Sequence, residues 1–302
     1  MKITIIGAGN VGTSVAYALI MREFAKEIVL IDINDDLLLA KELELSQSIA
    51  ALNLDIELIC TKEYSYSQNS QIILFTAGLA RKDGQSRDEL LQINANIMLD
   101  CAKRVKRFNE EPLFIILTNP VDFLLNTLYE SGIFNAKKIV AMAGVLDNAR
   151  FKYELAKKLK VKTSSVDTRL MGFHNDDMVL LKSHSSVGNR KLTELLSEEE
   201  FEDVENEVKT GGAKVIKHLK NSAYLAPASA CLRMLEAMRS GEFLPMSVIL
   251  NGEFGIKNKA FGVMARLGLE GVREIMCLTL AQEEQEKLEK SLIKYQYKYK
   301  GE

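Results

Sequence analysis

Short apolar runs alternate with helical stretches along the first half of the chain. The runs hold few polar residues and are rich in β-branched side chains, as in strands that are covered on both faces in a parallel sheet. Five such strands are expected, at residues 3–6, 28–31, 72–75, 114–117 and 139–142. Between them, apolar residues recur at helical spacing, for example from residue 11 to residue 19. The alternation predicts an α/β fold in which residues 1–145 form a doubly wound parallel sheet.

The pattern changes near residue 146, without a visible hinge sequence. Four strands are expected beyond it, at residues 166–171, 178–185, 247–250 and 261–265. Three helices are expected, at residues 198–219, at 223–238 and at the C-terminus. Because strands and helices no longer alternate regularly, this half predicts an α+β domain over residues 146–302.

Composition and charge then exclude several classes of protein. The chain has 302 residues, of which 47% are hydrophobic, so it is long enough to bury a large core. Its net charge of −2 provides no positive field for nucleic acid or for an anionic membrane surface. No apolar run is long enough for a secretion signal or a membrane helix, so a soluble, cytoplasmic protein is expected. The four cysteines lie far apart and form no Cys-x-x-Cys pair, so neither a metal site nor a disulfide framework is predicted.

A glycine-rich motif directly follows the first predicted strand. The pattern G-x-G-x-x-G, which is typical of the Rossmann dinucleotide-binding turn, is formed by Gly7, Ala8, Gly9, Asn10, Val11 and Gly12. The first glycine permits the tight turn, the second lets a pyrophosphate approach the backbone, and the third lets helix and strand pack closely. Asp32 ends the second predicted strand, twenty residues after Gly12, where a carboxylate binds ribose hydroxyls and repels a 2′-phosphate. The motif and the acid together predict NAD as the cofactor, against the alternative of a glycine turn that binds no nucleotide.

Four further segments carry polar side chains at strand ends or helix starts. They are residues 78–91, which include Arg81 and Arg87; residues 118–122, Thr-Asn-Pro-Val-Asp; residues 145–150, Val-Leu-Asp-Asn-Ala-Arg; and residues 172–179, Gly-Phe-His-Asn-Asp-Asp-Met-Val. Together with the glycine motif, and in the same order along nearly the whole chain, these segments resemble the lactate/malate dehydrogenase family. Five ordered matches are far more specific than any one of them. The resemblance implies an enzyme that transfers a hydride between a 2-hydroxy acid and NAD.

The resemblance assigns the proton chemistry to His174 and Asp147. In the family, the histidine of a G-x-H-G-D-x-M segment removes the hydroxyl proton while the hydride leaves the same carbon, and His174 occupies that position. Imidazole suits this role because its usual pKa of about 6.5 lies near working pH. Asp147 is expected to bond the other ring nitrogen and to stabilise the imidazolium. Taken alone, an acid at this position would be interpreted as a helix cap.

The same resemblance assigns further residues to the substrate and the cofactor. Arg150 is expected to hold the carboxylate beside the reacting carbon in the bidentate geometry that guanidinium favours, and Arg87 to polarise the substrate carbonyl. Asn119 is expected to position the substrate, to contact the cofactor and to precede a cis peptide bond at Pro120. The remaining expected contacts are Ser222 for the substrate, and Asn94 and Leu117 for the cofactor.

Arg81 distinguishes between the two branches of the family. Lactate enzymes usually carry glutamine at this position and malate enzymes carry arginine, which faces the far end of the substrate. A second carboxylate that is buried without a partner costs several kcal/mol, and hydrogen bonds to Arg81 offset about 1.5–3 kcal/mol of that cost. The prediction is therefore oxidation of (S)-malate to oxaloacetate, with a lactate or other 2-hydroxy-acid dehydrogenase and a catalytically silent NAD-binding protein as the alternatives. The resemblance also implies a homo-oligomer, with a tetramer favoured over a dimer.

Two positions depart from the family pattern. Asn175 replaces the glycine that usually follows the histidine, and we expect the turn to survive because Asn tolerates left-handed backbone. Asp83 replaces a proline in the loop that is expected to close over the substrate. Losing the φ restraint of proline is expected to make the open loop more mobile, and the new carboxylate adds negative charge near the entrance.

Overall fold

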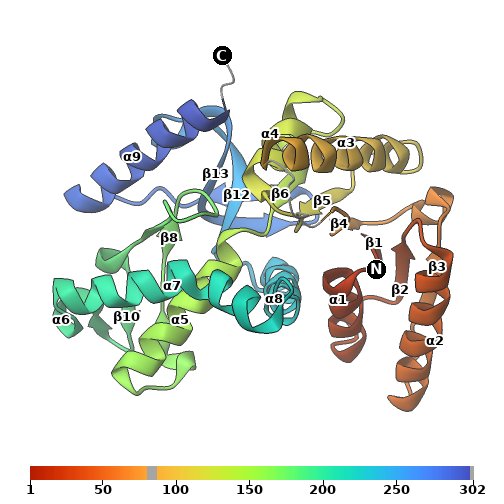
Figure 1. Cartoon of the computed structure of the whole chain (residues 1–302), viewed down its shortest axis with the longest axis horizontal. Coiled ribbons are helices and arrows are strands. Elements are labelled where there is room, and N and C mark those ends of the chain that lie inside the picture. Colours follow the sequence, from red (N-terminus) through yellow and green to blue (C-terminus); the bar gives the residue numbers. More distant parts are fainter. Residues whose placement is uncertain (80–86, 300–302) are drawn as a thin grey trace.

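The parallel strands of the first half belong to one large sheet. In the computed structural model, which describes residues 1–79 and 87–299 and the side chains of residues 1–79 and 89–294, the sheet has the strand order β14-β13-β12-β6-β5-β4-β1-β2-β3 (Figure 1). The strands β1 to β6 are parallel. Their bounds are β1 Lys2–Ile6, β2 Glu27–Ile31, β3 Glu57–Thr61, β4 Ile72–Phe75, β5 Leu113–Ile116 and β6 Ile139–Ala141. The order runs outward from β1 in both directions, which is the doubly wound arrangement that the alternating pattern predicts.

The five strands predicted in the first half of the chain agree with the structure to within one residue at every end, but the prediction omits β3. This strand lies at the edge of the sheet beside β2, and its side chains are exposed or only partly buried. It therefore has no continuous apolar run of the kind that marks a doubly covered strand.

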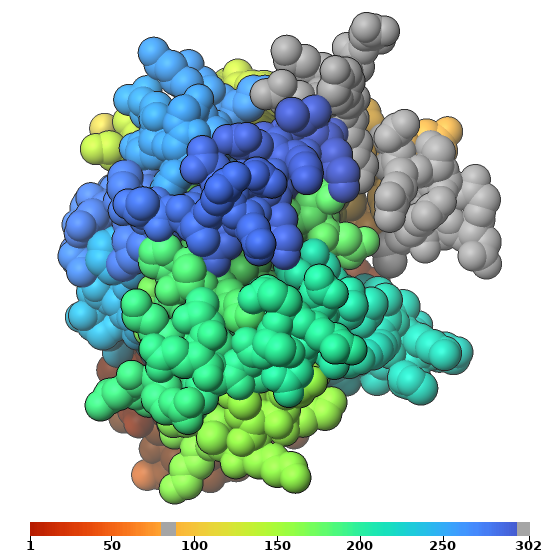
Figure 2. Space-filling model, turned by 90° about the vertical axis from the view of Figure 1, so that its left-hand side faces the viewer, coloured from red at the N-terminus to blue at the C-terminus, as the bar shows by residue number. Residues whose placement is uncertain are grey.

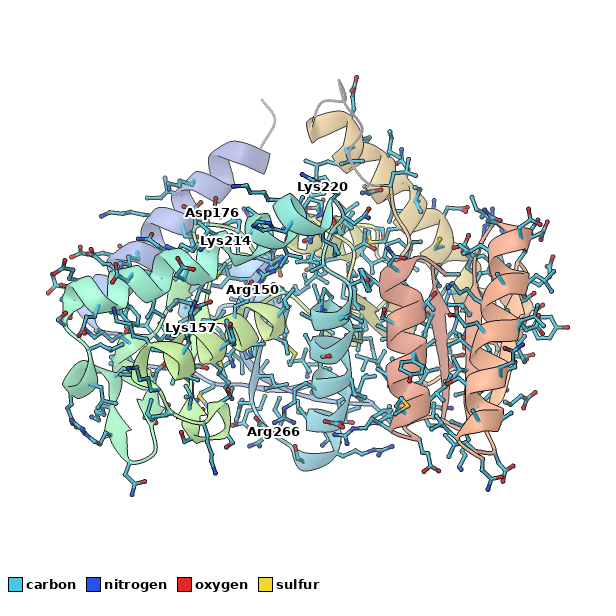
Figure 3. The ribbon with its side chains drawn as sticks, turned by 60° about the horizontal axis from the view of Figure 1, so that its bottom comes forward. Arg150, Lys157, Asp176, Lys214, Lys220 and Arg266 are labelled. Atoms are coloured by element: carbon cyan, nitrogen blue, oxygen red, sulfur yellow. The ribbon has the colours of Figure 1, made fainter. Side chains whose placement is uncertain are left out.

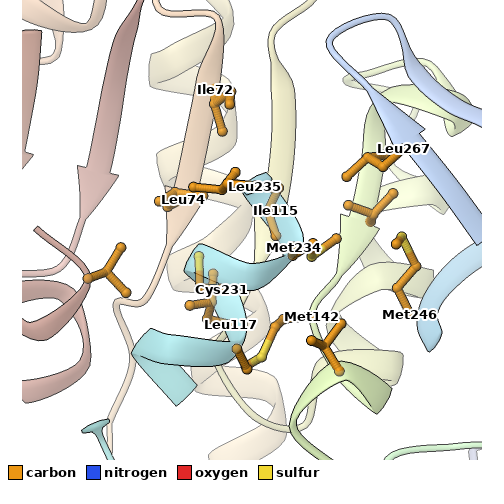
Figure 4. Close-up of a cluster of buried hydrophobic side chains, with 14 of the residues drawn as sticks. Ile72, Leu74, Ile115, Leu117, Met142, Cys231, Met234, Leu235, Met246 and Leu267 are labelled. Carbon is orange, nitrogen blue, oxygen red and sulfur yellow. The ribbon is translucent and has the colours of Figure 1, made fainter. Parts of the chain in front are cut away.

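Helices cover both faces of the sheet, and successive side chains of each strand point to opposite faces. Ile72 and Leu74 pack on the side of α1 (Asn10–Met21) and α8 (Leu225–Ser240). Ile73 and Phe75 pack on the side of α3 (Arg87–Lys106) and α4 (Val121–Glu130). Figure 4 shows the cluster on the α8 face, where Leu235 lies close to Leu74. Each such buried side chain contributes about 1.5–3 kcal/mol, so these clusters hold the helices on the sheet.

The second half of the chain extends the same sheet with antiparallel strands. Ser247 of β12 (Leu244–Asn251) pairs with Ala141 of β6, and β13 (Lys257–Gly268) and β14 (Gly271–Ile275) follow in order. The apolar pattern predicts the centres of β12 and β13, at residues 247–250 and 261–265, but not their place in the sheet. The predicted division between residues 145 and 146 falls within α5 (Gly144–Leu159) and stays a prediction.

A second apolar core lies beside the sheet, between α5 and α7 (Glu198–Leu219). Among its buried members are Phe151, Leu155, Val166, Leu170, Phe201 and Val204. Helix α7 has the predicted bounds and begins with a capping box formed by Ser197 and Glu200. Helix α8 begins two residues later than predicted.

The two strands predicted at residues 166–171 and 178–185 are wrong in extent. The structure has the short strands β7 (Val166–Asp167), β8 (Leu170–Met171) and β9 (Val179–Leu180), with a 3₁₀ turn, η4, over Lys182–His184. Between β7 and β8, the Thr168 hydroxyl donates to Asn148 and the Arg169 N–H donates to the Ser185 hydroxyl, while the Arg169 carbonyl accepts the Leu181 N–H. The remaining elements are α2 (Asp35–Ala51), η1 (Tyr64–Ser67), η2 (Ala136–Lys138), η3 (Thr163–Ser165), β10 (Ser186–Val187), β11 (Arg190–Lys191), α6 (Leu192–Leu195) and η5 (Glu253–Gly255).

Helix α9 (Gln282–Tyr299) lies at the surface and packs Leu288 on the large apolar cluster that includes Ile72 and Leu74. Figure 2 shows it in blue at the surface, directly above the green and teal segments of the second half. The Ser183 N–H donates to Glu284 at 2.9 Å, and Lys287 donates to Glu205 of α7 at 3.3 Å, so α9 is attached to η4 and to α7. Over the described ranges, no helix is both long and apolar enough to cross a membrane.

Candidate active site

Most of the predicted site residues that the structure describes gather at the carboxyl edge of the parallel strands. Gly7 follows β1, Asp32 follows β2, Asn119 follows β5, and Asp147 lies in the first turn of α5 just beyond β6. In open parallel sheets, ligands bind at this edge where the connections diverge to opposite faces. His174 reaches the same place from the turn between β8 and β9, because its ring contacts Asp147.

The first and third glycines of the fingerprint are required by close packing. Gly7 has a φ of +107°, and a Cβ there would lie 2.7 Å from the backbone nitrogen of Ala77. A Cβ at Gly12 would overlap the carbonyl oxygen of Gly7. The Thr76 hydroxyl donates toward the carbonyls of Ile6 and Gly7, which fixes the turn against the end of β4. Larger residues at either glycine would therefore separate α1 from the sheet.

The second glycine leaves open space where a phosphate would approach. Gly9 precedes the first residue of α1, and no atom lies within 4 Å of a Cβ built on it. The free N–H groups and the dipole of a helix N-terminus favour an anion at this point. Asp32 Oδ2 accepts the N–H of Ala8 at 2.7 Å, and its Oδ1 accepts the N–H of Ile33, so the carboxylate is fixed beside the glycine turn. These residues fit a dinucleotide whose pyrophosphate lies on the start of α1 and whose ribose lies at Asp32.

The other residues predicted to contact the cofactor differ in their surroundings. Asn119 is exposed at the end of β5 and precedes Pro120 through a cis peptide bond, as expected. Asn94 is buried, and its amide accepts the N–H of Leu79 at 2.8 Å and donates to the carbonyl of the same residue. Leu117 is buried in the apolar core that α8 covers (Figure 4). Asn94 thus holds the backbone where the predicted loop begins, and its contact with the cofactor stays a prediction.

His174 and Asp147 form the predicted couple. His174 Nδ1 lies 2.6 Å from Asp147 Oδ2, and Asp147 is 1% exposed. A carboxylate that close accepts the Nδ1–H, which leaves Nε2 as the nitrogen that exchanges a proton with a ligand. Within the described part of the chain, no side chain bonds Nε2.

A second buried carboxylate, which the sequence analysis did not identify, supports the same histidine. Asp122 Oδ2 accepts the backbone N–H of His174 at 2.7 Å, and its Oδ1 accepts the hydroxyl of Ser247 on β12. Burial raises the pKa of Asp122, although the hydrogen bonds from Ser247 and the His174 N–H oppose this shift. Asp122 belongs to the quoted Thr-Asn-Pro-Val-Asp segment, but its partners are 52 and 125 residues away in sequence. It joins α4, the sheet and the histidine turn at one point.

The charges around His174 favour its protonated form. Burial alone would lower the pKa of His174, but the charge of Asp147, its hydrogen bond and the charge of Asp122 outweigh this effect. The pKa of His174 is therefore raised above its usual value, in spite of the opposing charge of Arg150. The imidazolium form is the one that can donate a proton to a carbonyl oxygen.

Arg150 lies one helical turn after Asp147 on α5. Its Nη1 donates to Asp147 Oδ1 at 3.0 Å, so one carboxylate holds both the histidine ring and the guanidinium. The Arg150 side chain is 23% exposed, whereas that of Asp147 is 1% exposed. Arg150 can therefore still contact a ligand. Figure 3 shows Arg150 where α5 and α7 lie against each other. Ser222 is exposed in the connection between α7 and α8, and no contact in the structure tests its predicted substrate role.

The turn that carries His174 is built differently from our expectation. Asn175 does not adopt a positive φ, so its tolerance of left-handed backbone is not what preserves the turn. Its side chain accepts the N–H of Asp177 at 2.7 Å, which is an Asx turn. The left-handed residue is Gly172, with a φ of +102°. A Cβ at Gly262 of β13 would overlap the Gly172 carbonyl, so this second glycine lets the turn lie directly on the sheet.

Part of the predicted site lies outside the described residues. Arg81 and Asp83 fall within residues 80–86, which the structure does not describe. Arg87 is the first residue of α3, and its side chain also lies outside the described part. The assignments of these residues stay predictions.

Comparisons with known proteins agree with the motifs. The family model "lactate/malate dehydrogenase, NAD binding domain" matches residues 1–141, and "lactate/malate dehydrogenase, alpha/beta C-terminal domain" matches residues 144–297. A probable malate dehydrogenase of Campylobacter jejuni is 78% identical over 298 residues, which are 99% of each chain. The structure of the malate dehydrogenase from Aeropyrum pernix is 33% identical to this chain, with a TM-score of 0.92. The structure of a minor L-lactate dehydrogenase from Enterococcus mundtii is 30% identical, with a TM-score of 0.93. Both alignments cover 98% of this chain and 96% of the other chain. The chain belongs to the lactate/malate dehydrogenase family.

Proposed function

We propose that the protein is an NAD-dependent malate dehydrogenase, which interconverts (S)-malate and oxaloacetate. The observation that carries the proposal is the couple of His174 with buried Asp147, which also binds Arg150 at the carboxyl edge of an NAD-binding sheet. Support for malate comes from the probable malate dehydrogenase that is 78% identical along the full chain.

The histidine couple supplies the proton transfer. When malate is oxidised, neutral His174 accepts the hydroxyl proton at Nε2, and the imidazolium is stabilised by the Asp147 carboxylate at Nδ1. In the reverse direction, the protonated ring gives the proton to the carbonyl oxygen of oxaloacetate. Asp122 holds the backbone N–H of His174, so the ring stays in place while its charge changes.

The cofactor is held by the glycine turn and Asp32. Held there, NAD would supply the hydride acceptor for malate oxidation, and NADH the hydride donor for the reverse reaction. The open backbone at Gly9 admits the pyrophosphate, and the Asp32 carboxylate selects the ribose with free hydroxyls.

Three arginines account for the polar groups of the substrate. Arg150, held by Asp147, is assigned to the carboxylate beside the reacting carbon. By resemblance, Arg87 polarises the carbonyl and Arg81 binds the second carboxylate, with Asn119 and Ser222 beside the substrate. By resemblance, the segment that carries Arg81 is expected to close over the substrate and to exclude water from these charges.

Consumption of NADH with oxaloacetate and with pyruvate tests the proposed function. The purified protein is expected to oxidise NADH with oxaloacetate at a much higher kcat/KM than with pyruvate. A preference for pyruvate would instead indicate a lactate dehydrogenase, whose fold is equally similar. NADH binding without turnover of either acid would indicate a silent NAD-binding protein.

The raised pKa of His174 predicts a pH dependence of opposite sign in the two directions. Reduction of oxaloacetate needs the protonated ring, so its kcat/KM is expected to fall as pH rises through the raised pKa. Oxidation of malate needs the neutral ring, so its kcat/KM is expected to rise over the same range. Asp147→Asn removes the charge that contributes most to raising the pKa, and it is expected to move both inflections to lower pH. Profiles of kcat/KM against pH measure the shift.

A matched control for this experiment is Asp203→Asn, which removes an exposed carboxylate that pairs with Lys158. It is expected to leave the inflections in place. Unchanged inflections in Asp147→Asn would contradict the assigned role of the couple.

The Asx turn predicts a measurable role for Asn175. Asn175→Gly removes the acceptor of the Asp177 N–H and adds freedom to the unfolded chain, so the free energy of unfolding is expected to fall by about 1–2 kcal/mol. Because the residue directly before Asn175 is the catalytic His174, kcat is expected to fall as well. Urea unfolding and steady-state kinetics measure the two effects. Asn175→Ser, whose hydroxyl can accept the same N–H, is expected to lose less; equal stability of all three proteins would show that the bond contributes nothing.

The resemblance also supports a homo-oligomer, with a tetramer favoured over a dimer. Leu39 and Leu43 of α2 are more than half exposed in the single chain, and burial between copies would remove both from water. Sedimentation velocity on the purified protein distinguishes monomer, dimer and tetramer.

A further inference from the structure

Helix α7 contains two adjacent glycines well inside its length. Gly211 and Gly212 lie in a helix that continues to Leu219, and neither has a positive φ. The backbone conformation therefore does not require glycine, and alanine would be the more favourable residue in a helix interior. Glycine at such a position is explained where a Cβ would disturb a close contact, and one of the two glycines has such a contact.

That contact is the side chain of Arg150. A Cβ built on Gly212 would lie 3.2 Å from Nη2, 3.6 Å from Cζ and 3.7 Å from Nη1 of Arg150. Because three guanidinium atoms lie at similar distances, the group faces the α7 backbone rather than touching it edge-on. The 3.2 Å approach is closer than ordinary carbon–nitrogen contact, so an alanine methyl at residue 212 would displace the guanidinium by a few tenths of an ångström.

Displacement of the Arg150 guanidinium would affect the reaction in two ways. Arg150 Nη1 donates to Asp147 Oδ1, and the same carboxylate holds His174 through Oδ2. Arg150 is also the residue assigned to the substrate carboxylate, so its position affects substrate binding directly. Bidentate binding of a carboxylate tolerates little error in the guanidinium position.

We propose that Gly212 is a positioning residue, whose missing side chain lets the Arg150 guanidinium lie against the α7 backbone in the orientation that binds the substrate carboxylate. The proposal rests on the proposed function, because it assigns to Arg150 the carboxylate beside the reacting carbon. It adds a second helix, α7, to the elements that determine how tightly substrate is bound.

The neighbouring glycine provides a matched control. A Cβ at Gly211 would lie 3.5 Å from Cδ and 3.8 Å from Nε of Arg150, which is ordinary van der Waals contact. Gly211→Ala and Gly212→Ala therefore change helix propensity and size equally, at adjacent positions of the same helix, but only the second crowds the guanidinium.

Steady-state kinetics of the two variants test the proposal. Gly212→Ala is expected to raise KM for oxaloacetate about tenfold or more, with a smaller effect on kcat, while its Tm does not fall and its NADH affinity stays unchanged. Gly211→Ala is expected to stay within about twofold of wild type in kcat and KM. Wild-type KM in Gly212→Ala, or an equal rise in both variants, would overturn the proposal.

Two further measurements separate this mechanism from its competitors. In an Arg150→Lys background, Gly212→Ala is expected to change KM by less than about twofold, because the residue acts through the guanidinium. A full effect in that background would mean that the methyl group blocks the substrate itself, and the proposal would be wrong. Crystal structures of wild type and Gly212→Ala, which need no turnover, are expected to show the Arg150 guanidinium shifted in the variant relative to wild type. An unchanged Arg150 would overturn the proposal. Failure of the wild type to reduce oxaloacetate would overturn only the proposed function.

Discussion

Replacing His174 with asparagine is expected to lower kcat with oxaloacetate by about 10²–10⁴-fold, the usual contribution of a positioned acid or base. Asparagine can keep an N–H directed at Asp147, which lies 2.6 Å from the ring nitrogen in the wild type, but it has no group that titrates near neutral pH. Proton transfer is therefore lost while the local hydrogen bonding is largely kept. Stopped-flow and steady-state measurements of NADH oxidation determine the loss.

The effect is expected to be confined to the chemical step. The glycine turn and Asp32 are untouched, so NADH should bind to His174→Asn with wild-type affinity. His218→Asn makes the same substitution at an exposed position in the last turn of α7 and is expected to keep full activity. If His174→Asn kept a kcat within a few-fold of wild type, His174 would not be the proton donor.

Replacing Arg81 with glutamine is expected to change the substrate preference more than any other single substitution. Oxaloacetate would place its second carboxylate in a closed site without a cationic partner, whereas pyruvate has only a methyl group there. Sites built around a polar partner discriminate by up to about 10⁴–10⁵-fold against ligands that do not match. The ratio of kcat/KM for oxaloacetate to that for pyruvate is therefore expected to fall by 10² or more, chiefly through oxaloacetate.

A control for charge alone is Arg190→Gln, on exposed β11. It is expected to leave the ratio unchanged. An equal loss on both substrates in Arg81→Gln would show that the residue serves general catalysis or loop structure rather than recognition of the second carboxylate.

The sequence predicts the buried part of the fold well because burial on both faces leaves an unbroken apolar run. The runs at β1, β2, β4, β5 and β6 illustrate this relation. Edge strand β3 has no such run and was missed. The joining of β12 to β6 was also missed, since it depends on a pairing between Ser247 and Ala141 that no local pattern records.

In the candidate site, too, some residues could be identified from sequence motifs and others only from contacts in the folded chain. Motif resemblance identified His174, Asp147 and Arg150, which the structure brings together. Asp122 received no role, because its function depends on meeting the His174 backbone and the Ser247 hydroxyl across long stretches of sequence. The same holds for Gly262 of β13, whose contact with the histidine turn appears only once the chain is folded.

The central claim is that His174 and Arg150, both held by Asp147, act on one end of a dicarboxylic acid. A crystal structure with NAD and a dicarboxylate that does not react tests it most directly. We expect the group equivalent to the malate hydroxyl to lie within hydrogen-bond distance of His174 Nε2, and Arg150 to bind the adjacent carboxylate through two N–H groups. A dicarboxylate bound away from His174, or held at that end by a residue other than Arg150, would contradict it.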